Sequence, residues 1–391
     1  MTDPGAGGAG GEVMYNPFED GFADDPYAQY AAIRADGRVH HNPLGLRVLS
    51  HYEDCFELLR LGGTSVDERN ATNIVAPSVP EDLVERDGER SRSILSLDPP
   101  DHTRLRRLVS SAFTVRRIER LRDRARVLVA ELLDDIAGDT AADEPVDLLA
   151  RFAFPLPFVV ISELLGMPDG DRDQLRAWSH EMTRSLEPFN DEPTLRRIIA
   201  AADQMFAHVD EAIEWKRRNP ADDLLSGMIA AEEDGDRLTP VELRDQVVLL
   251  YLAGHETTVN LIGNGTLALL RHRDQLERLV RDPSLDANAV DELLRYDSPV
   301  QVSRRIATTD IEIAGEQIGA GELVLTLLGS SNRDEGKWGP TAADVDLARE
   351  GAEAVPALVR RFPRLELAAD APAWNGRIVL RGLDSLPVTL G

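Results

Sequence analysis

Cysteine is almost absent from this chain of 391 residues, which contains only Cys55. A single cysteine excludes an internal disulfide framework and any zinc or iron–sulfur site built from several thiolates. Because disulfides mark secreted chains, we expect a cytoplasmic protein. Lysine is nearly as scarce, since Lys216 and Lys337 are the only two and every other basic side chain among the 43 is an arginine.

Positive charge and long apolar runs are also in short supply. The chain has 43 Lys and Arg residues against 69 Asp and Glu, which gives a formal net charge of −26. That balance argues against nucleic acid and against an anionic membrane surface as partners, because both would repel the protein. The apolar stretch 152–167 is broken by two prolines, and 247–253 is too short to span a membrane. Residues 1–14 are rich in glycine, and we expect a flexible tail there.

Helical periodicity dominates the rest of the chain. The pattern predicts helices over 25–35, 51–61, 101–112, 115–137, 146–166, 171–186, 192–218, 221–232, 240–271 and 287–296. It predicts strands at both ends, over 38–41, 46–50, 311–318, 322–328, 363–367 and 377–390. We therefore expect one large domain over 15–391, mainly α with minor β, built around a long central helix. The irregular segment 62–96 predicts a functional or mobile loop.

The middle of the predicted helix 240–271 reads Ala253-Gly254-His255-Glu256-Thr257, followed by a second threonine. A carboxylate and hydroxyls inside an apolar helix are costly unless other groups satisfy them. A threonine hydroxyl can bond the carbonyl one turn back, and Gly254 lets another group approach the backbone. The motif alone is equally consistent with a kinked core helix that holds a satisfied polar pocket. A zinc-protease helix is excluded, because residue 259 is valine.

Three further patterns combine charges at helical spacing. Glu292 and Arg295 share a helix face, and their apolar neighbours indicate partial burial, although such pairs are usually exposed. His102 and Arg106 lie one turn apart, which by itself is typical of an exposed basic face. The segment 104–126 contains nine arginines and only two acidic residues. In so acidic a chain this is a local positive patch, suited to an acidic partner or to carboxylates of a ligand.

In this order and spacing the motifs resemble those of the cytochrome P-450 superfamily in its soluble bacterial form. The likeness extends over about 15–391, includes Arg305, and continues through Asn332-Arg333-Asp334 and Arg361-Phe362-Pro363. It implies a haem whose iron is held by a cysteine thiolate and inserts oxygen from O₂ into a C–H bond. The substrate would be a small hydrophobic molecule, and the electrons would come from a ferredoxin.

The resemblance also implies roles for individual residues. Glu256 and Thr257 would be catalytic and relay protons, while Ala253 and Gly254 would lie against the haem. His102, Arg106 and Arg305 would bind the haem propionates. Glu292 and Arg295 would form the family's structural Glu-x-x-Arg motif. The Arg104–Arg126 face would dock the acidic ferredoxin, and the loop 62–96 would cover the substrate.

The chain departs from the family at the iron ligand. The family carries its cysteine in a Phe-x-x-Gly loop between the Asn-Arg-Asp and Arg-Phe-Pro segments, whereas here the match stops at about Ala352 and resumes at about Glu353. Residues 273–391 contain no Cys, His or Met. Cys55 lies at the other end of the chain, and we predict a small buried hydrophobe there and not a metal ligand.

Two functional interpretations follow. In the first, the chain is a haem monooxygenase that has lost its ligand loop, so that haem binding is in doubt and catalytic competence is lost. The missing segment would also leave a gap against the central helix. In the second, the chain is a haem-free relative that binds and activates a partner enzyme such as a glycosyltransferase. An unrelated helical binding protein is a third and more distant alternative.

Overall fold

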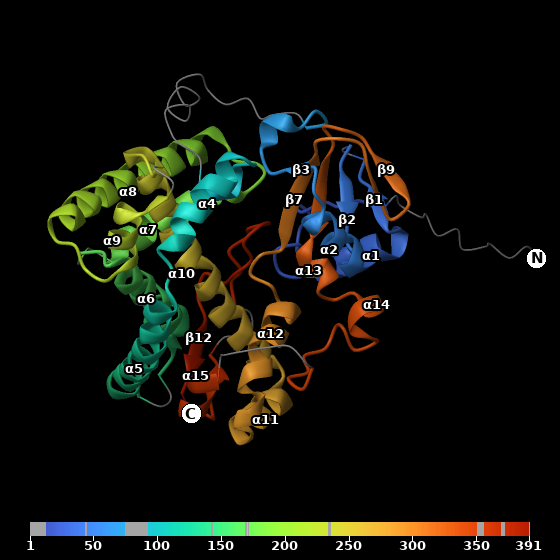
Figure 1. Ribbon diagram of the computed structural model, residues 1–391. Coiled ribbons are helices and arrows are strands. Elements are labelled where there is room, and N and C mark those ends of the chain that lie inside the picture. The colour runs from blue at the N-terminus through green and yellow to red at the C-terminus, as the bar shows by residue number, and fades with distance from the viewer. Residues whose placement is uncertain are drawn as a thin grey trace, which may run out of the picture.

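Helices form most of the protein, as the ribbon of the computed structural model shows (Figure 1). The structure describes residues 13–43, 45–74, 93–141, 144–168, 170, 172–233, 236–349, 356–368 and 372–390. The α-helices are α1 (Tyr27–Asp36), α2 (Tyr52–Arg60), α4 (Asp101–Ser111), α5 (Val115–Asp139), α6 (Pro155–Leu165), α7 (Arg172–Thr183), α8 (Glu192–Arg218), α9 (Leu224–Ala230), α10 (Pro240–Arg271), α11 (Arg273–Arg281), α12 (Asp286–Tyr296), α13 (Leu328–Ser331), α14 (Glu335–Trp338) and α15 (Pro356–Arg361).

The 32-residue helix α10 is the central element predicted from the sequence. A capping box starts it, because Thr239 accepts from the backbone N–H of Glu242 while the Glu242 carboxylate accepts from the N–H of Thr239. The helices α6, α8 and α12 pack against α10, and both large hydrophobic clusters of the core include its side chains. In Figure 1 it runs between the α6–α9 group and the pair α11 and α12.

Strands from distant parts of the chain make a five-stranded sheet in the order β1-β2-β10-β7-β3. Their bounds are β1 (Val39–His41), β2 (Arg47–Leu49), β10 (Leu323–Leu327), β7 (Val302–Ala307) and β3 (Thr64–Ser65). The strands β2 and β10 are parallel, and the other neighbours are antiparallel. A second sheet joins β11 (Glu366–Leu367), β12 (Pro387–Thr389) and β4 (Val146–Asp147). Two hairpins complete the set, β5 (Glu232–Glu233) with β6 (Asp236–Arg237) and β8 (Ile311–Ile313) with β9 (Glu316–Ile318). The fold is thus mainly α with minor β and not all-α.

Several predicted elements differ in the structure. The helix predicted over 146–166 begins instead as β4, passes through a π-helical turn at Leu149–Ala153 and becomes α6 only at Pro155, because proline is favoured in a first helical turn. The strand predicted over 377–390 is reduced to β12 and two isolated bridges, at Leu380 and Leu383. The helix α11 and the strand β7 were not predicted. Only His272 separates α11 from α10, and no glycine or proline marks that break, whereas Pro283 follows the C-terminal end of α11.

Some expectations concern residues outside the described ones. They include most of the predicted tail 1–14, the central part of the loop 62–96, and the junction between Ala352 and Glu353. Within the described ranges, no helix is both long and apolar enough to cross a membrane.

Candidate functional site

The motif on α10 is buried on one side by α6. A Cβ atom placed on Gly254 would lie 2.8 Å from Ile161 Cδ1, so the glycine allows the two helices to approach closely. His255 is fully buried, and its Nδ1 donates to the carbonyl of Tyr251 at 2.7 Å. Packing against α6 therefore accounts for Gly254, whereas the haem contacts of Gly254 and of the exposed Ala253 stay predictions.

Glu256 is a buried carboxylate surrounded by positive groups. Its Oε1 lies 3.5 Å from Nε2 of His255. Burial acts to raise the pKa of Glu256, but the interaction with His255 and the charges of His255, Arg377 and His180 outweigh it and lower that pKa below the ordinary glutamate value. The neighbouring side chains thus favour the charged form of Glu256.

Arg377 is also close to Glu256, and no sequence pattern indicated this. Its guanidinium is buried and donates to Thr183 Oγ1 at 2.6 Å and to the carbonyl of His180 at 2.8 Å. The next two backbone N–H groups, of residues 378 and 379, donate to the Glu187 carboxylate at 2.8 and 3.2 Å. This C-terminal turn is therefore fixed to the end of α7, next to the acid of the central helix.

Thr257 and Thr258 use their hydroxyls within the helix. Thr257 Oγ1 donates to the carbonyl of Ala253 at 3.0 Å, and Thr258 Oγ1 lies 3.5 Å from the carbonyl of Gly254. This is the pairing one turn back that the sequence predicted. Both threonines line a cavity of about 710 Å³ between α10 and α12. The gap expected against the central helix stays a prediction, because the junction 352/353 lies outside the described residues.

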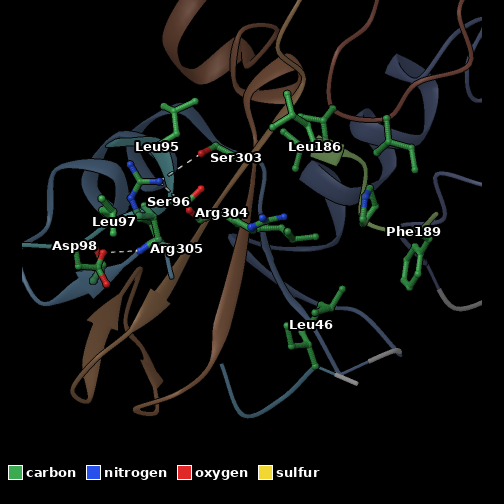
Figure 2. A pocket seen from close by; sticks show the side chains of 18 of the residues that line it. Leu46, Leu95, Ser96, Leu97, Asp98, Leu186, Phe189, Ser303, Arg304 and Arg305 are labelled. Atoms are coloured by element: carbon green, nitrogen blue, oxygen red, sulfur yellow. Dashed lines mark hydrogen bonds between the residues drawn. The ribbon is translucent and has the colours of Figure 1, made fainter. Parts of the chain in front are cut away.

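The predicted propionate-binding residues come together in a different and larger cavity. His102 and Arg106 on α4 and Arg305 on β7 all line a space of about 900 Å³. Figure 2 shows Arg305 next to Ser303, whose hydroxyl is 3.5 Å from Nη1 of Arg305. Asp98 lines the same space and accepts from the N–H of Val66 at 2.9 Å. Two arginines and a histidine, from α4 and from β7, thus line one cavity, and their binding of propionates stays a prediction.

Glu292 and Arg295 form a buried ion pair. Both side chains are more deeply buried than the partial burial that the sequence indicated. Arg295 donates to both oxygens of Glu292, at 2.7 and 2.8 Å. The remaining guanidinium hydrogens reach the carbonyls of Asn332, Ala342 and Asp344, at 2.7, 2.6 and 2.8 Å. Arg349, which the sequence analysis missed, adds a contact to Glu292 at 3.2 Å. This cluster fastens the segment 332–349 onto α12.

The lone cysteine is part of the core. Cys55 is buried among Val39, Leu49 and Leu58, and its thiol donates to the carbonyl of Leu49 at 3.4 Å. Burial and the nearby charge of Asp54 raise the pKa of this thiol well above its ordinary value. The thiol is therefore a small buried hydrophobe, as predicted. No group of three or more metal-binding side chains occurs in the described ranges.

The described residues include candidate ligands for the haem propionates but no axial ligand for the haem iron. Arg106 and Arg305, together with the hydrogen-bonding ring of His102, fit two propionates, because arginine and carboxylate are geometrically matched. The axial side does not fit, since residues 273–391 provide no Cys, His or Met and Cys55 is in a separate cluster. No step of oxygen chemistry is derived for a thiolate-bound haem in this chain.

The Arg104–Arg126 face is less positive than its arginine content indicates. Six of the nine arginines form ion pairs: Arg104 with Asp236 and Glu242, Arg117 and Arg120 with Asp222, Arg122 with Glu119, Arg124 with Glu131 and Glu163, and Arg126 with Asp123. Most of these acids come from other segments of the chain. Docking of an acidic ferredoxin on this face stays a prediction.

Comparison with known proteins decides the family. The family model for cytochrome P-450 matches residues 43–282. The chain belongs to the cytochrome P-450 family. It is 37% identical to the vitamin D(3) 25-hydroxylase of Pseudonocardia autotrophica, over 97% of this chain and 98% of that protein. It is 40% identical to the 6-deoxyerythronolide B hydroxylase of Saccharopolyspora erythraea, over 75% of this chain and 76% of that one.

Solved structures confirm the cytochrome P-450 fold. The P-450 PksS of the Bacillus subtilis bacillaene polyketide synthase superposes with a TM-score of 0.82 at 32% identity, covering 97% of this chain and all of that one. The P-450 monooxygenase TamI, bound to tirandamycin C, superposes with a TM-score of 0.79 at 35% identity, over 96% and 99% of the two chains. The alignment with the Pseudonocardia protein runs over 412 positions. Since this chain has 391 residues, at least 21 of those positions have no counterpart in it.

Proposed function

We propose that this protein has the scaffold of a P-450 hydroxylase for a small hydrophobic molecule, but that it does not carry out monooxygenation. The observation that carries the proposal is the place of its only cysteine. Cys55 is buried in the core on α2 with a protonated thiol, and no other thiolate is available to the iron. Without a thiolate, the electron donation that promotes cleavage of the O–O bond is missing.

The substrate class is supported by the larger cavity and by the relatives. The lining includes many apolar side chains, and a volume of about 900 Å³ suits a molecule the size of a drug or a macrolide fragment. The names of the relatives refer to vitamin D(3), 6-deoxyerythronolide B and polyketide biosynthesis, all of which concern largely apolar molecules.

Glu256 and Thr257 are the residue types that a proton relay needs, but this chain has no thiolate-ligated haem iron to which they could deliver protons. Glu256 lies near the positive Arg377, and the Thr257 hydroxyl is bonded within α10. Thiolate-bound haem supplies oxygen activation in this family. In this chain Glu256 carries a buried charge and the Thr257 hydroxyl satisfies the carbonyl of Ala253.

A pair of loop insertions tests the proposal. The family's Phe-x-x-Gly loop, taken from the Saccharopolyspora hydroxylase, is inserted between Ala352 and Glu353, once with its cysteine and once with serine in its place. Each protein is supplied with haem, reduced and exposed to carbon monoxide, and its absorption spectrum is recorded. We expect a thiolate-type Soret band only for the cysteine insertion.

The unmodified protein is the reference in that experiment. A thiolate-type band from it would overturn the proposal. A colourless, folded protein that co-purifies with a glycosyltransferase would instead support the auxiliary function, in which the family fold serves as a binding partner. Electron delivery by a ferredoxin at the Arg104–Arg126 face is relevant only to the cysteine insertion.

A further inference from the structure

The larger cavity is apolar at its rim. Phe18, Leu95, Leu186 and Phe189 are large hydrophobic side chains that are exposed and line this cavity. The rings of Phe18 and Phe189 meet edge to face, with their centroids 5.5 Å apart. In Figure 2, Leu95 lies on one side of the space and Leu186 and Phe189 on the other. Exposed apolar side chains on both sides of one cavity indicate a ligand with an apolar body.

The lining also contains arginines, and Figure 2 shows Arg305 on the same side as Leu95 and Asp98, across the space from Leu186 and Phe189. The charges of these arginines are not equally neutralised. Arg304 forms an ion pair with Glu68. Within the described part of the chain, by contrast, His102, Arg106 and Arg305 have no carboxylate at ion-pair distance. Arg305 is half-buried, and among the described residues its guanidinium donates to the neighbouring Arg304 carbonyl, at 2.8 Å, and to the Ser303 hydroxyl, at 3.5 Å.

One acid lies in the same cavity, and it is already bonded. The Asp98 carboxylate accepts from the Ser65 hydroxyl and from the N–H of Val66. Burial lowers the pKa of Arg305, and the charge of Asp98 acts in the opposite direction without reversing the shift. A half-buried guanidinium whose hydrogen bonds go to neutral groups gains from a second anion, because hydrogen bonds between charged partners are stronger than neutral ones.

We propose that this cavity binds an apolar molecule that carries a carboxylate, with the carboxylate at Arg305 and Arg106 and the apolar chain directed toward Phe18 and Phe189. This inference rests on the proposed function, because a thiolate-bound haem would engage the same cations through its propionates. It narrows the substrate class from a hydrophobic molecule to an amphipathic acid. A neutral ligand of the same shape would leave the desolvated Arg305 without a charged partner.

The test compares dodecanoate with 1-dodecanol, which have the same chain and differ in the head group. Both are titrated calorimetrically into the colourless full-length protein. We expect dodecanoate to bind about tenfold more tightly than the alcohol, the difference that one charge-assisted hydrogen bond provides. Arg305→Gln should abolish that preference, whereas Arg305→Lys, which keeps the charge, should retain most of it.

Arg107→Gln is the matched control for Arg106→Gln, because Arg107 is the next residue of α4 and does not line the cavity. We expect Arg106→Gln to reduce the preference several-fold and Arg107→Gln to leave it unchanged. Equal affinity for acid and alcohol, or a preference that survives in folded Arg305→Gln protein, would overturn the inference. A thiolate-type Soret band would overturn the proposed function instead, so the two failures are separate readouts.

Discussion

Replacing Arg295 with methionine tests how strongly its buried ion pair and hydrogen bonds attach the segment 332–344 to α12. The guanidinium supplies five hydrogen bonds, two to the Glu292 carboxylate and three to carbonyls of the segment 332–344. Only 5% of Arg295 and 2% of Glu292 is exposed, so water cannot replace these bonds. Methionine fills a similar volume and offers no donor.

The loss of unfolding free energy in Arg295→Met comes mainly from the Glu292 carboxylate, which stays buried without its arginine. Removing one member of a buried ion pair destabilises a protein by about 3–5 kcal/mol, because the other charge stays buried without compensation. Here Glu292 would keep the N–H of Asp346 at 2.7 Å and the contact to Arg349 at 3.2 Å. We therefore expect a loss in the lower part of that range, about 3 kcal/mol of the free energy of unfolding.

Urea unfolding followed by circular dichroism measures this loss. Arg281→Met is the control, because Arg281 and its partner Glu277 are 3.7 Å apart with side chains that are 74% and 62% exposed. An exposed pair of this kind contributes about 0.5 kcal/mol or less. If Arg295→Met cost less than about 1 kcal/mol, or no more than the control, the reasoning from burial would be refuted.

Three other changes test the central helix. Gly254→Val would press against Ile161 and should cost about 1–3 kcal/mol of unfolding free energy in urea, whereas an unchanged value would show that the two helices can separate freely. Thr239→Ala removes the hydroxyl that caps α10 and should cost about 1 kcal/mol, measured in the same way, and a variant as stable as the parent would contradict the cap. Glu256→Gln tests the lowered pKa of Glu256. Its ionised form stabilises the folded state above the ordinary value of 4.5, and this contribution is lost as the pH falls through the lowered value. The stability difference between parent and variant should therefore shrink from about pH 7 toward about pH 3, and a difference independent of pH would contradict the shift.

Features that depend on neighbouring residues could be predicted from the sequence. The start of α10 followed from Thr239 and Pro240, and the hydrogen bond of the Thr257 hydroxyl followed from its place in a helix. The burial of Glu292 and Arg295 followed from the apolar residues around them. The motifs also identified the family, because their order along the chain is far more specific than any one of them.

Features that depend on distant partners could not be predicted. Arg124 pairs with Glu163 and Arg117 with Asp222, across 39 and 105 residues, so the arginine-rich segment read as a positive patch when most of its charge is neutralised. The approach of Arg377 to His180 spans 197 residues and has no local pattern. Such contacts are set by how helices pack, which composition and periodicity do not determine.

The central claim is that no thiolate of this chain can ligate haem iron, and the reduced, carbon monoxide-bound spectrum of the haem-supplied protein tests it most directly. The Cys55→Ser variant is measured beside the parent. We expect no thiolate-type Soret band from either protein. A thiolate-type band from the parent would contradict the claim, and its loss in Cys55→Ser would show that the buried cysteine had left the core to bind the iron.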